Sequence, residues 1–128
     1  MLKKGLWALA AVALTAGIAS AGTVDNTAVT FFTVDGLQAV KGTLRVARNS
    51  ADNNQYIGCS IYAYASGSHS IVCTGRNAAG QVRNCQTSDA NMIKVALSLN
   101  PASYLFYTLK TDGVTCDRVI AVNESFNL

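Results

Sequence analysis

Four cysteines are the residues of this sequence with the clearest chemical consequence. Their even number, the absence of a Cys-x-x-Cys pair and the single histidine favour two disulfides over a structural zinc site or a catalytic thiol. If residues 78–80 form a three-residue turn, Cys73 and Cys85 face each other across a hairpin, which favours the pairs Cys73–Cys85 and Cys59–Cys116. A slip of the turns would instead pair Cys59 with Cys73 and Cys85 with Cys116. We expect no metal site and no cofactor.

Acid–base catalysis would depend on His69, the only histidine, which lies beside a turn in Ser68-His69-Ser70. A serine hydrolase also needs a nucleophile on a constrained turn, and no Gly-x-Ser-x-Gly is present. Most carboxylates stand in turn-forming contexts, such as Asp35 before Gly36, where they bond to their own backbone. We therefore assign no catalytic residue, and a small secreted hydrolase that uses His69 is an alternative function.

Tyrosines supply the main candidate for binding. Alternation over residues 56–64 places Tyr56, Tyr62 and Tyr64 on one side of a strand and an apolar set on the other. Exposed tyrosines offer flat apolar area together with a hydroxyl, which suits protein or glycan surfaces. We expect these three side chains, flanked by Arg76, to form a binding patch. The alternative is that a helix covers this face and the tyrosines belong to the core.

The first residues have the order of a secretory signal. Lys3 and Lys4 precede an apolar run over residues 6–18, and Ala19-Ser20-Ala21 offers small residues for cleavage. The run is shorter than the roughly 20 apolar residues that span a bilayer. The sequence therefore predicts a signal peptide at residues 1–21, a single disulfide-linked domain at residues 22–128, no membrane span after cleavage, and a periplasmic or extracellular location.

The charge of the chain does not favour nucleic acid as a partner. The formal net charge is +3, and it falls to about +1 without Lys3 and Lys4. The other basic residues are scattered along the sequence, whereas a phosphate-binding surface needs clustered lysine and arginine. We expect no binding to nucleic acid.

Periodicity and turn residues predict the elements that carry these side chains. The expected order is β-β-β-β-α-β-β, with strands at residues 37–46, 56–64, 70–76, 81–86, 104–110 and 114–123. The helix begins after Ser88 or Asp89 as N-cap and ends at Asn100-Pro101. The fold class is α+β: one antiparallel sheet of about six strands, one helix and two disulfides.

The last two strands are predicted to form a hairpin. Asp-Gly between two alternating runs is a strong signal for a two-residue turn, and Asp112-Gly113 provides it. This turn would set Leu109 opposite Cys116 and Tyr107 opposite Arg118.

Three segments carry a resemblance to known proteins: residues 47–59, with Arg48-Asn49-Ser50-Ala51-Asp52 and Tyr56-Ile57-Gly58-Cys59, residues 73–80 and residues 122–125. The sequence resembles small exported proteobacterial proteins of unassigned function, which implies export and disulfides but no particular activity. We therefore expect an extracytoplasmic binding or interaction module, which could be inhibitor-like. Its expected partner is an envelope or extracellular protein or a glycan. A structural component of the envelope is a further alternative, and the balance leans against an enzyme.

Overall fold

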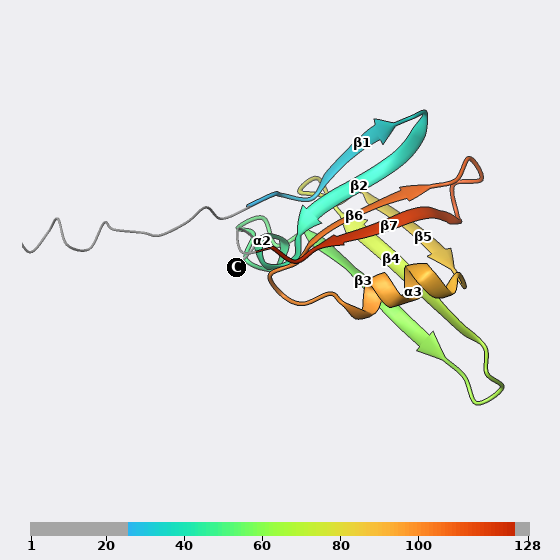
Figure 1. Cartoon of the computed structure of the whole chain (residues 1–128). Helices are drawn as coiled ribbons and strands as arrows, with labels where there is room; N and C mark the ends of the chain where they lie inside the picture. The colour runs from blue at the N-terminus through green and yellow to red at the C-terminus, as the bar shows by residue number, and fades with distance from the viewer. Residues whose placement is uncertain (1–25, 125–128) are drawn as a thin grey trace, which may run out of the picture.

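The computed structural model describes residues 26–124, so the predicted signal at residues 1–21 lies outside the described part of the chain. Two antiparallel sheets and two short helices make up the described residues (Figure 1). The first sheet, in the order β1-β2-β6-β7, contains β1 (Thr30–Val34), β2 (Leu37–Thr43), β6 (Tyr104–Leu109) and β7 (Cys116–Val122). The second, in the order β3-β4-β5, contains β3 (Tyr56–Ala63), β4 (His69–Arg76) and β5 (Val82–Thr87). The helices are α2 (Leu44–Arg48) and α3 (Ala90–Leu97).

The predicted α+β class with antiparallel strands and two disulfides is confirmed, and the structure adds detail to it. The strands divide between two sheets, and β1 is a strand that the predicted order did not contain. β1 joins β2 through Asp35 and Gly36, whose φ angles are both positive, 53° and 77°. Such a turn matches the right-handed twist of a hairpin. The strand predicted over residues 37–46 ends at Thr43, because α2 begins at Leu44.

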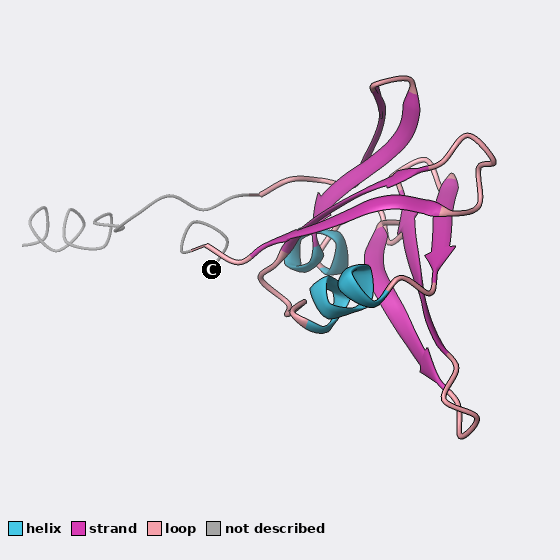
Figure 2. Ribbon diagram, turned by 45° about the vertical axis from the view of Figure 1, so that its right-hand side comes forward, coloured by secondary structure: helices cyan, strands magenta, loops and turns pink. Residues whose placement is uncertain are grey.

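The core lies between the two sheets (Figure 2). Val40, Leu105 and Tyr107 from the first sheet and Ile71 from the second are completely buried. The Tyr107 hydroxyl donates a hydrogen bond of 2.6 Å to the backbone carbonyl of Arg83, and burial raises the pKa of this phenol. The polar end of a core side chain therefore links β6 to β5.

The helix α3 occupies the side of the molecule where the sheets diverge, in contact with β7, β3 and β4. Asp89 is its N-cap, and its carboxylate accepts a 2.9 Å hydrogen bond from the backbone N–H of Met92. Ile93 and Ala96 are buried, whereas Leu97 is 64% exposed. Within residues 26–124 no helix has the length and the apolar character needed to cross a membrane.

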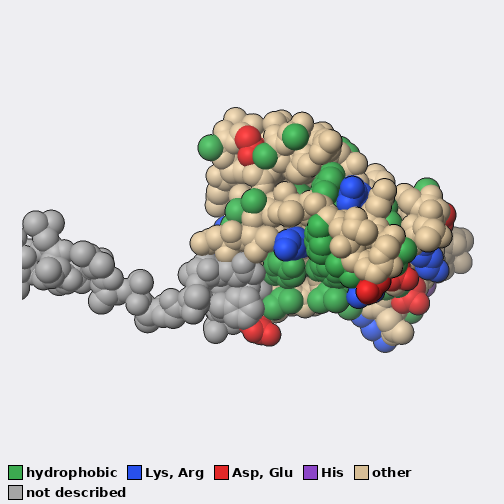
Figure 3. Space-filling view, turned by 90° about the horizontal axis from the view of Figure 1, so that it is seen from above, with side chains coloured by type: hydrophobic (Ala, Val, Ile, Leu, Met, Phe, Trp, Pro, Cys, Tyr) green, Lys and Arg blue, Asp and Glu red, His purple; other side chains and the backbone are tan. Residues whose placement is uncertain are grey.

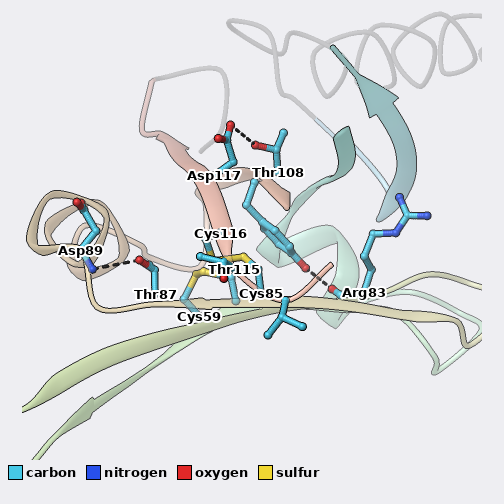
Figure 4. Close-up of a disulfide and its surroundings, with 12 residues drawn as sticks. Cys59, Arg83, Cys85, Thr87, Asp89, Thr108, Thr115, Cys116 and Asp117 are labelled. Carbon is cyan, nitrogen blue, oxygen red and sulfur yellow. Dashed lines mark hydrogen bonds between the residues drawn. A yellow bond between two sulfur atoms is a disulfide. The ribbon is translucent and has the colours of Figure 1, made fainter. Parts of the chain in front are cut away.

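The favoured disulfide pairing is wrong, and the alternative pairing is present. The bonds join Cys59 to Cys73 and Cys85 to Cys116. Cys73 does face Cys85 across the β4–β5 hairpin, as predicted, but it also faces Cys59 across the β3–β4 hairpin. Three cysteines thus stand in a row on the core face of the second sheet. Cys85 reaches across the core to Cys116 on β7 (Figure 4).

The hydrogen-bond pattern of the sheet explains why Cys73 bonds to Cys59. In antiparallel strands, pairs that exchange backbone hydrogen bonds have Cα atoms ~5.5 Å apart, and the intervening pairs are closer, at ~4.5 Å. The bond from Asn77 N–H to the Gln81 carbonyl places Cys73 and Cys85 in a hydrogen-bonded, wider pair. Toward β3, Cys73 is then in a narrow pair, and its Cα lies 4.0 Å from that of Cys59.

The β6–β7 hairpin has the predicted starting pair and a shifted register beyond it. Leu109 faces Cys116, as predicted, but Arg118 faces Thr108, and Tyr107 faces Val119. A bulge in the register between Thr108 and Leu109 accounts for the difference of one residue.

Candidate functional site

The β3–β4 hairpin is the most exposed part of the second sheet. It extends beyond the other strands at the lower right of Figure 1, and the N–H of Tyr64 closes it with a 2.9 Å bond to the Ser68 carbonyl. Near its tip both faces are open, because Ile61 on one face is 42% exposed and Tyr62 on the other is 45% exposed. Apolar side chains on this hairpin are therefore available to a partner.

The predicted binding residues share one face of this hairpin, which we call the tyrosine face and define as Tyr56, Tyr62, Tyr64 and Arg76. The three tyrosines are 48%, 45% and 61% exposed. The helix α3 packs on the opposite side of β3, between the two sheets (Figure 2). The alternative that a helix covers the tyrosines is therefore wrong.

The tyrosine face has two ends and is not a single cluster. Tyr56 and Arg76 are directly opposite each other at the start of the hairpin, and Tyr62 and Tyr64 lie near its tip. At ~3.3 Å per residue, Tyr56 and Tyr62 are separated by roughly 20 Å along the strand. Arg76 is held in place because its Nε donates a hydrogen bond to the backbone carbonyl of Asn54.

A second concave surface, which the sequence did not reveal, runs along the other side of β3. This β3 groove has a volume of about 660 Å³ and is bordered by α2, β3 and α3. Its lining includes Leu44, Arg48, Tyr56, Ile57, Ile61 and Leu97. No signal for this groove was present in the sequence, because Leu97 falls at helical spacing with the buried Ile93 and Ala96, and only the structure shows that it is exposed.

The β3 groove is basic at the end formed by α2. Arg45 and Arg48 line it, and none of its lining residues within the described part of the chain carries a carboxylate. The nearby Asp52 is bound to its own loop, where its carboxylate accepts hydrogen bonds from the backbone N–H of Asn54 and from the side chain of Gln55. Elsewhere, lysine and arginine side chains are dispersed over the surface drawn in Figure 3.

His69 lies at the tip of the hairpin, exposed to solvent, with Nδ1 3.3 Å from the carbonyl of Gly67. Among residues 26–124 no carboxylate contacts this ring, so the geometry shows no acid–base pair for the alternative function, a hydrolase that uses His69. The same residues contain no group of three or more His, Cys, Asp or Glu side chains able to hold a metal ion.

Comparison with known proteins does not place this chain in a family. No protein-family model matches it, and neither the curated proteins nor the solved structures contain a significant match. The resemblance to small exported proteobacterial proteins therefore stays a prediction, and the four cysteines in two disulfides are the part of it that the structure shows.

Proposed function

We propose that this protein is an exported interaction module whose β3–β4 hairpin contacts a partner protein outside the cytoplasm. The observation that carries the proposal is the exposure of Tyr56, Tyr62 and Tyr64 on a hairpin that extends from the body of the protein. Tyrosine is enriched at the centres of protein interfaces, because its ring contributes area and its hydroxyl contributes a hydrogen bond. The two disulfides suit an oxidising compartment.

A protein partner fits this surface better than a glycan does. The exposed residues near the tip include the aliphatic Ile61 as well as the tyrosines, so apolar area is available on both faces of the hairpin. A surface of this kind gains free energy chiefly from burying apolar area, at about 25 cal/mol per Å² before the costs of association. A sugar ring, with its many hydroxyl groups, would leave the aliphatic face unused.

The test is a pull-down from the envelope fraction and the culture medium with the wild-type protein and two variants. Tyr62→Ala combined with Tyr64→Ala removes the distal part of the tyrosine face, and we expect it to lower recovery of the specific partner at least about tenfold. Ile120→Ala is the matched control, since Ile120 is 43% exposed but lies on β7 of the other sheet. Equal recovery of every captured protein by the double variant and the wild type would contradict the proposal.

A further inference from the structure

The outer edge of β3 is open for pairing with another strand. β3 is the terminal strand of its sheet, and β4 is the only strand that pairs with it among the described residues. Because the Tyr64 N–H donates a hydrogen bond to the Ser68 carbonyl, the even-numbered positions of β3 are the ones bonded to β4. The N–H and C=O groups of Cys59, Ile61 and Ala63 therefore point away from β4, and no other described residue accepts or donates a hydrogen bond there.

This edge lacks the usual protection against strand pairing. Exposed edges are commonly blocked by charged residues, prolines or bulges. From Tyr56 to Ala63, β3 has no charged residue, no proline and no bulge in its register. The opposite edge of the same sheet is occupied, because Gln86 of β5 donates a 2.8 Å hydrogen bond to the carbonyl of Val114.

The β3 groove lies next to this open edge and is apolar along most of its length. Ile61 and Leu97, which are 42% and 64% exposed, line it from β3 and from α3. Side chains of an added strand would alternate between the two faces of the sheet, so every second one would enter the groove. Backbone bonds along the edge would supply affinity, and the groove would select the alternate side chains.

The charge of the groove indicates the chemistry of its occupant. Arg48 stands at the end where β3 begins, and its side chain forms no salt bridge or hydrogen bond with any other residue of the described part of the chain. An antiparallel strand added to β3 would bring its carboxyl-terminal end to this position. A second copy of this chain fits poorly, because the β3 strand that it would offer carries no acidic residue to meet Arg48.

We propose that the β3 groove binds an extended segment of a partner protein, which adds to β3 as an antiparallel strand. The segment has apolar residues at alternate positions and a carboxylate, from an acidic residue or a chain terminus, at the end that meets Arg48. The inference rests on the proposed function only in that the protein is an interaction module. It uses the edge and inner side of β3, whereas Tyr62 and Tyr64 of the tyrosine face lie on the outer side near the hairpin tip; Tyr56 borders both surfaces.

The test uses synthetic eight-residue peptides in which threonine alternates with valine, isoleucine or phenylalanine, each ending in two glutamates. Binding to the disulfide-bonded protein is followed by NMR together with amide hydrogen exchange. We expect at least one peptide to slow exchange at the amides of Cys59 and Ile61 at least about tenfold, because these groups gain hydrogen bonds only when a strand is added. The same peptide ending in two lysines should bind at least about tenfold more weakly.

Two pairs of variants separate the backbone contribution from the charge. Ile61→Pro removes an N–H that points away from β4, so we expect the hydrogen bonds between β3 and β4 to be retained and peptide binding to be lost. Ile61→Val, the matched control, should retain the hydrogen bonds and the peptide binding. Arg48→Glu should weaken binding at least about tenfold, whereas Lys94→Glu, an equal charge reversal on α3 outside the groove, should not. A cooperative thermal unfolding transition is the check that each variant is folded.

Four outcomes would overturn the inference. The first is no binding of any glutamate peptide at millimolar concentration, and the second is binding that leaves exchange at Cys59 and Ile61 unchanged. The third is protection of these amides that grows with protein concentration in the absence of peptide, which would assign the edge to a second copy. The fourth is loss of peptide binding in the double variant of Tyr62 and Tyr64, which would connect the groove with the tyrosine face and contradict two separate surfaces.

Discussion

At the scale of single residues, Gly75 shows how closely the two sheets pack. A Cβ atom at this position would lie 2.5 Å from Cγ1 of Val40 and 2.9 Å from the hydroxyl of Tyr107. Both neighbours are completely buried, and the hydroxyl is held by its hydrogen bond to Arg83. Glycine is therefore required here by the space between β4 and the first sheet.

We expect Gly75→Ala to destabilise the protein by about 1–3 kcal/mol, the usual cost of forcing extra volume into a packed core. Urea unfolding monitored by circular dichroism measures the change. Gly58→Ala is the matched control in the neighbouring strand, because its new methyl group would meet only the end of the Tyr56 side chain, with the hydroxyl at 3.6 Å and Cζ at 3.9 Å. The control should stay within about 1 kcal/mol of the wild type. An equal loss in both variants would show that strand propensity, and not the close approach of the sheets, is responsible.

At the scale of elements, the loop between β6 and β7 is organised by one carboxylate. Asp112 accepts hydrogen bonds of 2.8 Å from the backbone N–H groups of Val114 and Thr115, and one of 2.7 Å from the Thr115 hydroxyl. The backbone and hydroxyl bonds from Thr115 are the main cause that lowers the pKa of Asp112 to about 2. The loop is thus ordered by an ionised aspartate, although the turn is longer than the predicted two-residue type.

This depressed pKa predicts an acid-sensitive loop. The folded pKa lies below the unfolded value of ~3.9, so the stabilising effect is complete above about pH 4 and is lost as the pH falls toward 2. Asp112→Asn should therefore lose less stability than the wild type between pH 4 and pH 2. Thermal unfolding at each pH measures this difference, and NMR titration of the Asp112 carboxyl carbon follows the proton directly. A midpoint near 4 would contradict the assigned hydrogen bonds.

At the scale of the whole molecule, three side-chain connections join the two sheets across the core within residues 26–124, in addition to the backbone bond from Gln86 to Val114. One is the disulfide Cys85–Cys116, and another is the hydrogen bond from Tyr107 to the Arg83 carbonyl. The third is the Arg83 side chain, which donates to the carbonyls of Phe32 and Ala39 at 3.2 and 3.1 Å and lies over the Phe31 ring. The bond Cys59–Cys73, by contrast, joins neighbouring strands within one sheet.

The two disulfides should therefore differ in their effect on stability. In the chain-entropy model, a bond closing 31 residues contributes almost 4 kcal/mol and one closing 14 residues about 3 kcal/mol. We expect the double variant Cys85→Ala/Cys116→Ala to lose more stability than Cys59→Ala/Cys73→Ala. Besides the longer loop that this bond closes, the first variant loses a covalent connection between the two sheets. Urea unfolding compares the two double variants, and mass spectrometry of the unreduced, digested protein checks the pairing. A larger loss on removal of Cys59–Cys73 would contradict this order.

Local patterns in the sequence were sufficient for much of the fold. Alternation over residues 56–64 identified β3 and both of its faces, and Asp89 identified the start of α3, because side-chain periodicity and capping depend on residues close together in the chain. The even number of cysteines was enough to predict two disulfides. The Asp112-Gly113 turn correctly predicted the first pair of the last hairpin, Leu109 opposite Cys116. The bulge that shifts the rest of its register had no local signal in the sequence.

The tertiary structure alone decided which surfaces of these elements are free. The partner of Cys73 depends on which of two neighbouring cysteines lies in the narrow pair, and the hydrogen bonds between strands distant from the cysteines decide that. The exposure of the tyrosines depends on where α3 packs. The β3 groove exists only because α3, which comes about 30 residues after β3, meets β3 and the neighbouring α2 along one edge. The sequence thus determined the elements and their apolar faces, but contacts between distant segments determined which faces remain open to a partner.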